Sequence, residues 1–175
     1  MRALIFLVDT LLSLALLVTL LRLLLQWVRA DFRNPLARAI LQLTNPLVLP
    51  LRRILPPVGS LDTATALVLL LIAAIQAAAG YLLSGIGPPP PLVWAELTLL
   101  EIVRGVLHTY FFVILLYALL SLIAPGTYSP AQALLTSLAE PVLRPVRRLI
   151  PPLGGIDFSP LWVLIIIQAL LILAS

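Results

Sequence analysis

The stretch NPLVLPLRRILPPVGSLD, residues 45–62, decides the fold because it occurs twice in the chain. Its counterpart, EPVLRPVRRLIPPLGGID, residues 140–157, lies 95 residues further on (140 − 45 = 95). The shared positions are Pro46, Pro50, Arg52, Arg53, Pro56, Pro57, Gly59 and Asp62, and Pro141, Pro145, Arg147, Arg148, Pro151, Pro152, Gly154 and Asp157. Eight shared positions at a single offset, without a gap, indicate an internal duplication.

The composition excludes a soluble domain. Of the 175 residues, 62% are hydrophobic and 10% are charged, and the mean hydropathy is +1.15. The chain has no cysteine, one histidine and seven acidic residues, so we expect no disulfide, no metal centre and no cofactor. All eleven basic residues are arginines, and most lie in two segments. That distribution suits the negative surface of a membrane and not a nucleic acid.

The apolar segments predict four membrane spans, because a span needs about 20 apolar residues. The expected spans are residues 3–28, 63–86, 94–123 and 160–174. The first repeat is then residues 1–87 and the second is residues 92–175, with a proline linker at 88–91 between them. Each repeat has an even number of spans, so the two repeats should run in the same direction through the membrane.

The arginines predict which side each segment occupies. Five of them, Arg29, Arg33, Arg38, Arg52 and Arg53, lie between the first two spans, and Arg144, Arg147 and Arg148 lie between the last two. The connection between the repeats has none. Because positive loops stay in the cytoplasm, both arginine-bearing segments should be cytoplasmic and both termini should lie outside.

Each arginine-bearing segment also contains an amphipathic pattern. Asn34-Pro35 and Ser129-Pro130 are typical helix starts, with a capping side chain followed by proline. Pro46 and Pro141 are expected to end these two helices, with another turn at Pro50 and Pro145 and a reversal at Gly59 and Gly154. The predicted fold is therefore all-α, with four membrane helices in two parallel tandem repeats. Each repeat adds an amphipathic interfacial helix and a re-entrant or interfacial turn rich in proline and arginine.

The candidate binding residues are arginines. Arg52, Arg53, Arg147 and Arg148 are expected either to bind anionic headgroups or a partner, or only to set topology by pairing with Asp62 and Asp157. Arg22, Gln26, Arg29 and Arg33 are spaced to line one helix face. Arg22 within a span indicates either a functional or paired charge or a side chain that reaches the headgroups.

Two charges inside the spans correspond under the duplication. Asp9 maps onto Arg104 (104 − 9 = 95), so the two are a candidate ion pair between the repeats. A local pair between Glu101 and Arg104 is the alternative, and a proton relay through His108 is a further one. No motif for a catalytic, cofactor or metal site is recognisable.

The duplicated motif resembles that of the YggT family of small bacterial membrane proteins. Both copies have the family's Pro-x-x-x-Pro-x-Arg-Arg core, at Pro46 to Arg53 and Pro141 to Arg148, followed by Pro-Pro, Gly and Asp. The resemblance extends over nearly the whole chain. It implies a non-enzymatic protein of the bacterial cytoplasmic (inner) membrane that supports membrane homeostasis under osmotic stress, or assembly of membrane components.

Expected partners are the lipid bilayer and its anionic lipids, with other membrane proteins or self-association as alternatives. A small channel or transporter, formed by the repeats or by an oligomer, is the alternative function. The middle of the spans counts against a pore within one chain, because Gln76 and Gln168 are nearly its only polar residues.

Overall fold

The computed structural model describes residues 2–59, 61–83, 85, 87–123, 129–150 and 157–174. This part of the chain is helical, and its only β-type pairing is a single bridge between Val58 and Leu61. The helices are α1 (Arg2–Trp27), α2 (Pro35–Arg52), α3 (Thr63–Leu83), α4 (Pro91–Ile123), α5 (Pro130–Leu149) and α6 (Ser159–Leu173). The expectation of an all-α fold is confirmed.

The helix boundaries follow the duplication. Helices α2 and α5 start at Pro35 and Pro130 (130 − 35 = 95), and α3 and α6 start 96 residues apart (159 − 63 = 96). Both predicted caps are present: Asn34 Oδ1 accepts the N–H of Leu36 at 2.9 Å, and Ser129 Oγ accepts the N–H of Gln132 at 3.1 Å. The same local signals therefore start the same helices in both halves.

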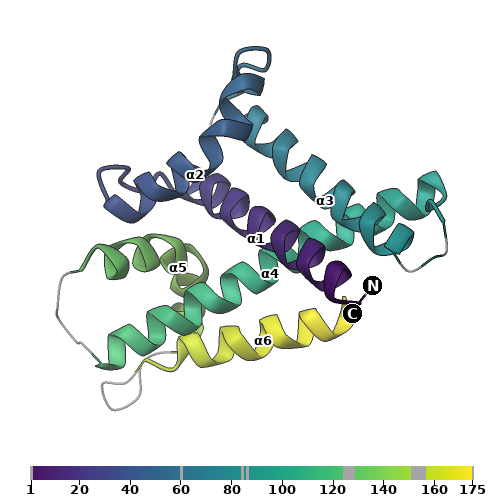
Figure 1. Cartoon of the computed structure of the whole chain (residues 1–175). Coiled ribbons are helices and arrows are strands. Elements are labelled where there is room, and N and C mark those ends of the chain that lie inside the picture. The colour runs from purple at the N-terminus through teal and green to yellow at the C-terminus, as the bar shows by residue number, and fades with distance from the viewer. Residues whose placement is uncertain are drawn as a thin grey trace.

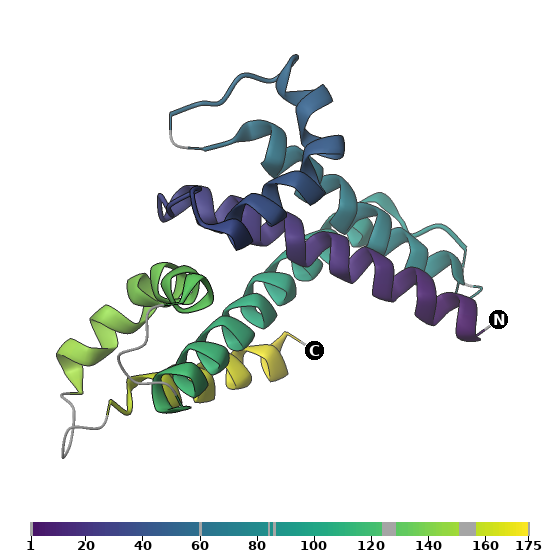
Figure 2. The ribbon, with the colours of Figure 1, turned by 60° about the vertical axis from the view of Figure 1, so that its left-hand side comes forward.

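The helices α1 and α4 run from one end of the molecule to the other, and α3 and α6 return (Figure 1). Both termini and the connection between α3 and α4 lie at one end, whereas α2 and α5 lie at the other (Figures 1 and 2). The 33-residue helix α4 joins the halves, because it contacts α3 and α1 as well as α5 and α6. The two arginine-bearing segments thus share one end of the molecule.

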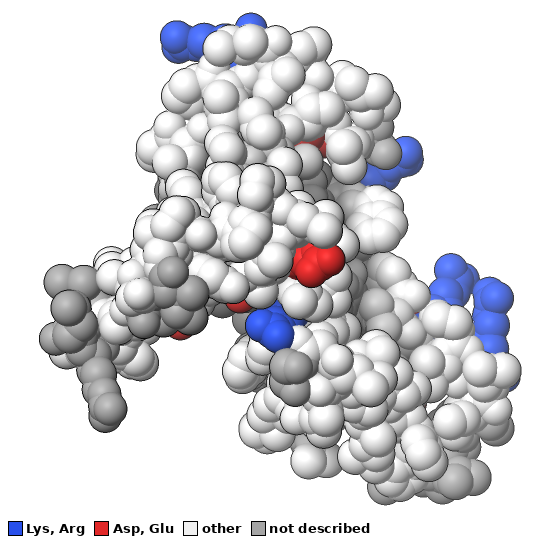
Figure 3. Space-filling view, turned by 90° about the vertical axis from the view of Figure 1, so that its right-hand side faces the viewer, with Lys and Arg blue, Asp and Glu red and all other residues white. Residues whose placement is uncertain are grey.

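Among the helices of the described residues, three are long and apolar enough to cross a membrane: α1, α3 and α4. Helix α6 is equally apolar but has only 15 residues, about 22 Å at ~1.5 Å per residue, which is shorter than the ~30 Å hydrocarbon core. Many large apolar side chains are exposed on these helices, for example Leu71 and Ile166. Uncharged atoms cover most of the face in Figure 3, and its charged groups form separate small patches. Such a surface is typical of a protein that faces lipid.

Two clusters of buried apolar side chains hold the helices together, and each draws on both halves. One cluster combines Leu25 of α1 with Ile114 of α4 and Leu143 of α5. The other combines Leu20 of α1 with Ala73 of α3, with partly buried side chains of α4 packed against it. The halves therefore form one packed unit.

The crossing of α1 and α4 depends on a glycine. A Cβ atom at Gly105 would lie 2.8 Å from Leu16 Cδ2 and 2.9 Å from Leu20 Cδ1. Without a side chain, α4 approaches α1 closely at this point, as small residues commonly permit in membrane helices. Helices α1 and α4 are therefore in direct contact at this point.

The predicted ends of the amphipathic helices were wrong. Helix α2 continues through Pro46 and Pro50, and α5 continues through Pro141 and Pro145. Each proline removes one N–H from the helical ladder, but all four lie on exposed positions, where water or headgroups can bond the freed carbonyls. Both helices bend instead of ending (Figures 1 and 2).

The apolar stripe of α2 faces outward. Leu36, Leu43 and Leu47 are between 42% and 69% exposed, whereas Ala37 and Val48 on the neighbouring face are fully buried against the rest of the protein. One apolar face of α2 therefore packs against the rest of the protein, and another apolar face is exposed, as expected for a helix lying in a membrane interface.

Candidate functional site

Asp62, immediately before α3, is the centre of a buried polar network. Its Oδ2 accepts hydrogen bonds from Arg52 Nη2 at 2.5 Å and from Gln26 Nε2 at 3.1 Å. Thr65 donates twice, from its hydroxyl to Oδ2 at 2.8 Å and from its backbone N–H to Oδ1 at 3.3 Å. The carboxylate thus caps α3 near the positive end of that helix and connects it to α1 and α2.

Asp157 has the same position in the second repeat. Its Oδ2 accepts a hydrogen bond from Arg147 Nε at 2.7 Å, and its Oδ1 accepts the backbone N–H and hydroxyl of Ser159 at 2.9 and 2.6 Å. Arg147 also donates to Glu140 at 2.7 Å and to the Tyr117 hydroxyl at 3.0 Å. Helix α6 begins at Ser159, and the side chain of its N-cap residue, Phe158, makes no capping bond, so the Asp157 carboxylate bonds the first N–H of the helix instead.

The two networks share their central ion pair but differ around it. Gln26 corresponds to Ser121 (121 − 26 = 95), whose side chain is much shorter. In the first repeat Gln26 bonds the carboxylate, whereas in the second a cavity of about 410 Å³ opens among Tyr117, Ser121 and Asp157. The carboxylate of the second network is accordingly the more exposed one: the side chain of Asp157 is 34% exposed and that of Asp62 only 5%.

Arg22 is buried and has no ion pair with a carboxylate of the described residues. It is 1% exposed, and its Nη1 donates to Thr44 Oγ1 at 2.7 Å and to Asn45 Oδ1 at 3.0 Å. Its Nε is a buried donor without a hydrogen-bond partner among the described residues. The guanidinium therefore joins α1 to the middle of α2, and it does not reach the surface of the protein.

The expected face of Arg22, Gln26, Arg29 and Arg33 does not form. Helix α1 ends at Trp27, and Arg29 adopts a left-handed backbone conformation with φ of 54°. Arg22 and Gln26 point into the protein, whereas Arg29 and Arg33 lie exposed in the turn before α2. The helical spacing in the sequence continued past the point where the backbone leaves the helix.

The two arginines of each pair in the duplicated motif make different contacts. Arg52 and Arg147 bond the aspartates, whereas the side chains of Arg53 and Arg148 are exposed and form no ion pair or hydrogen bond within the described part of the chain. Each exposed arginine precedes an exposed apolar residue: Ile54 is 76% exposed and Leu149 is 82% exposed. The sequence did not distinguish the two members of each pair.

The expected pair of Asp9 and Arg104 is replaced by other contacts. Asp9 Oδ1 accepts a hydrogen bond from Gln76 Nε2 at 3.2 Å. Arg104 lies 3.8 Å from Glu101, which is the local alternative, and its Nε donates to the carbonyl of Ala174 at 2.6 Å. Because the end of α6 offers this carbonyl beside α4, Arg104 bonds the negative end of that helix and not Asp9.

The remaining motif residues shape the turn after α2. Gly59 has a positive φ of 62°, which favours glycine, and the hydroxyl of Thr63 bonds the carbonyl of Pro56 at 2.8 Å. Pro57 lies in the same exposed turn. In the second copy, Pro151, Pro152 and Gly154 lie outside the described residues.

The aspartates predict how stability depends on pH. Burial raises the pKa of Asp62, but hydrogen bonds from Thr65 and Gln26 and the charge of Arg52 outweigh it, so the pKa lies below its usual value of 3.8. The pKa of Asp157 is lowered in the same way by Ser159 and Arg147.

A carboxylate whose pKa is lower in the folded than in the unfolded protein stabilises the fold when the pH is above the unfolded-state pKa. That stabilisation is lost as the pH falls through the folded-state pKa. Thermal unfolding in detergent should therefore be insensitive to these groups above pH 5 and shift to lower temperature below about pH 4. A variant with asparagine at both positions should lose most of that acid-induced shift.

The comparisons agree with the duplication. Residues 1–83 and 97–175 match the CCB3/YggT family, which is one matched segment for each half. A protein of Pseudomonas aeruginosa is 39% identical over 164 residues, which cover 91% of this chain and 82% of the relative. YggT of Escherichia coli K12 is 37% identical over 170 residues, covering 97% of this chain and 88% of the relative. Both relatives are named as uncharacterised. No solved structure matches the chain.

Proposed function

Since the chain belongs to the CCB3/YggT family, we propose that it is a non-enzymatic, multi-pass protein of the bacterial cytoplasmic (inner) membrane. In this proposal both arginine-bearing segments face the cytoplasm, α6 completes a fourth crossing, and both termini lie outside. The protein supports membrane homeostasis under osmotic stress, or the assembly of other membrane components, by holding anionic lipid at its cytoplasmic surface.

This proposal rests on the exposed member of each arginine pair. Arg53 with Ile54 and Arg148 with Leu149 stand at equivalent places (148 − 53 = 95), and all four side chains are exposed. An arginine next to an exposed apolar side chain suits the boundary between headgroups and acyl chains, with the charge on the phosphate and the apolar group below it. Arg33 and Arg38, also exposed at this end, add to the positive charge.

Replacing Arg53 and Arg148 together by glutamine should weaken retention of phosphatidylglycerol and cardiolipin by roughly tenfold or more, because each arginine near an anionic leaflet contributes ~1 kcal/mol. The measurement is lipid retention by the purified full chain in native mass spectrometry, at low and high salt. The matched control replaces both residues by lysine, which keeps the charge and should keep most of the binding.

The same variants test the role in cells. In a strain that lacks this protein, the lysine variant should restore growth after osmotic shock and the glutamine variant should not. If the glutamine variant inserts normally and retains anionic lipid as well as the unaltered chain does, the exposed arginines serve topology alone and the lipid proposal is wrong.

A further inference from the structure

A polar groove runs between α1 and α4 in the half of the molecule that contains the termini. Its volume is about 420 Å³. Near the start of α1 it is lined by polar side chains: Asp9, Thr10, Ser13, Gln76, Glu101 and Arg104. Further along the same helices it is lined by Leu14, Leu17 and Phe112, with His108 and Thr109 between Arg104 and Phe112 on α4. The groove is therefore amphiphilic along its length, with its polar end toward the termini.

The carboxyl groups that line the groove outnumber its arginine. Glu101 has Arg104 as an ion-pair partner at 3.8 Å, and His108, whose Nδ1 lies 2.9 Å from the carbonyl oxygen of Arg104, also lines the groove. Asp9 has no ion pair among the described residues. Asp9 receives one hydrogen bond, from the neutral amide of Gln76. A carboxylate inside a membrane span is costly unless it is paired, so Asp9 is the group of this groove that lacks a cation.

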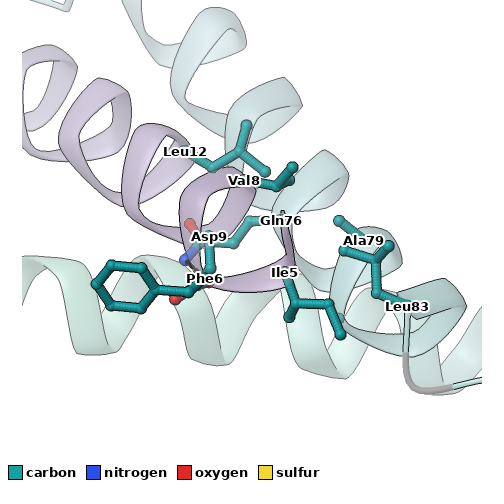
Figure 4. A pocket seen from close by; sticks show the side chains of 9 residues that line it. Ile5, Phe6, Val8, Asp9, Leu12, Gln76, Ala79 and Leu83 are labelled. Atoms are coloured by element: carbon teal, nitrogen blue, oxygen red, sulfur yellow. Dashed lines mark hydrogen bonds between the residues drawn. The ribbon is translucent and has the colours of Figure 1, made fainter. Parts of the chain in front are cut away.

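The amide of Gln76 also has an unsatisfied polar atom. Its Nε2 donates to Asp9 Oδ1 at 3.2 Å and to Ser13 Oγ at 3.0 Å. Its Oε1 is buried without a hydrogen-bond partner among the described residues. Figure 4 shows Asp9 and Gln76 directed toward each other from α1 and α3, beside an apolar cavity of about 360 Å³ lined by Ile5, Val8 and Leu83. The polar groups thus lie between one amphiphilic and one apolar space.

We propose that this groove binds the headgroup of a phosphoethanolamine lipid. The primary ammonium lies between Asp9 and Glu101, where it supplies the missing positive charge and donates hydrogen bonds to the carboxylates. The phosphate lies at Arg104, which keeps its Nε bond to Ala174 and uses its remaining N–H groups. One acyl chain follows the apolar part of the groove past Leu14 and Phe112, which are 52% and 53% exposed.

Two features favour this lipid over other occupants. The groove contains both signs of charge, which fits a zwitterionic headgroup better than a simple anion or a simple cation. Its apolar end is formed by exposed residues of two membrane-spanning helices, so an acyl chain can enter sideways from the bilayer. A soluble amine would use the polar end alone.

The test compares lipids that differ only in the ammonium group. The full chain in detergent is titrated with phosphatidylethanolamine, its N-methyl and N,N-dimethyl forms, and phosphatidylcholine, all with the same acyl chains, and binding is read by native mass spectrometry. Each methyl group removes one N–H donor, so affinity should fall stepwise, by roughly tenfold between the two ends of the series. Soluble phosphoethanolamine should compete only weakly.

Variants separate this groove from the arginine-bearing end. Asp9→Asn should abolish the preference for the primary ammonium. Glu96→Gln, which removes an exposed carboxylate of α4 outside the groove, should preserve it, and so should the glutamine variant of Arg53 and Arg148. Equal binding across the methylation series by the unaltered chain overturns the proposal, whether or not Asp9→Asn folds. So does a preference that persists in folded Asp9→Asn, or equally tight binding of the soluble headgroup.

Discussion

Asp62→Ala is expected to lower the free energy of unfolding by about 3 kcal/mol, and Asp157→Ala by only about 1 kcal/mol. Both substitutions remove a helix cap and the partner of an arginine. At Asp62 the lost hydrogen bonds are buried, so Gln26 and Thr65 are left with unpaired groups away from water. At Asp157 the carboxylate is one-third exposed, and solvent can replace part of what is lost.

The measurement is denaturant unfolding in detergent micelles, with both variants compared with Asp31→Ala. Asp31 is an exposed acid whose Oδ1 accepts only the backbone N–H of Arg33, at 2.8 Å. Its loss should change stability by less than ~0.5 kcal/mol. Equal losses at Asp62 and Asp157 would mean that burial does not distinguish the two networks.

The features that the sequence predicted correctly were those that occur in both copies of the duplication. The 95-residue offset located both capped helix starts, at Pro35 and Pro130, and placed Asp62 and Asp157 before the helices that they cap. Local chemistry decides such features, because a capping side chain and the backbone that it bonds are only a few residues apart. The long apolar helices α1, α3 and α4 were also predictable, since length and hydropathy determine which helices can span a membrane.

The contacts between helices were not predictable in the same way. Whether Arg52 or Arg53 meets Asp62 depends on the rotation of α2 about its axis, which the run of apolar residues leaves ambiguous. Arg104 was assigned to Asp9 because the duplication pairs their positions, but the carbonyl of Ala174 lies beside it only once α6 has packed on α4. Correspondence in sequence is therefore not proximity in space.

The prolines of α2 and α5 show a further limit. A rule drawn from soluble helices ends each helix before Pro46 and Pro141. Both helices continue because the freed carbonyls lie on an exposed face and the opposite face is fixed by packing, at Val48 in one copy and Leu143 in the other. Tertiary contacts thus outweigh the local preference.

Arg22→Ala is expected to cost about 3 kcal/mol of stability, because it removes a buried group that joins α1 to α2 and leaves a cavity. Arg22→Met fills the space without the charge and should recover most of that loss, since an apolar residue of similar volume needs no hydrogen bonds. The loss should be local. Only the first repeat has an arginine here; in the second, Tyr117 takes its place and bonds Arg147 within that repeat's own network.

Amide hydrogen exchange of the purified chain can therefore locate the effect. In Arg22→Ala, exchange should rise across α2, residues 35–52, as the helix separates from α1, whereas α5, residues 130–149, should stay protected. Tyr117→Phe is the matched control at the equivalent position. It removes one hydrogen bond to Arg147, which keeps its bonds to Glu140 and Asp157, so α5 should loosen only slightly. Equal exchange in α2 and α5 of Arg22→Ala would show that Arg22 stabilises the whole bundle and has no special role in holding α2.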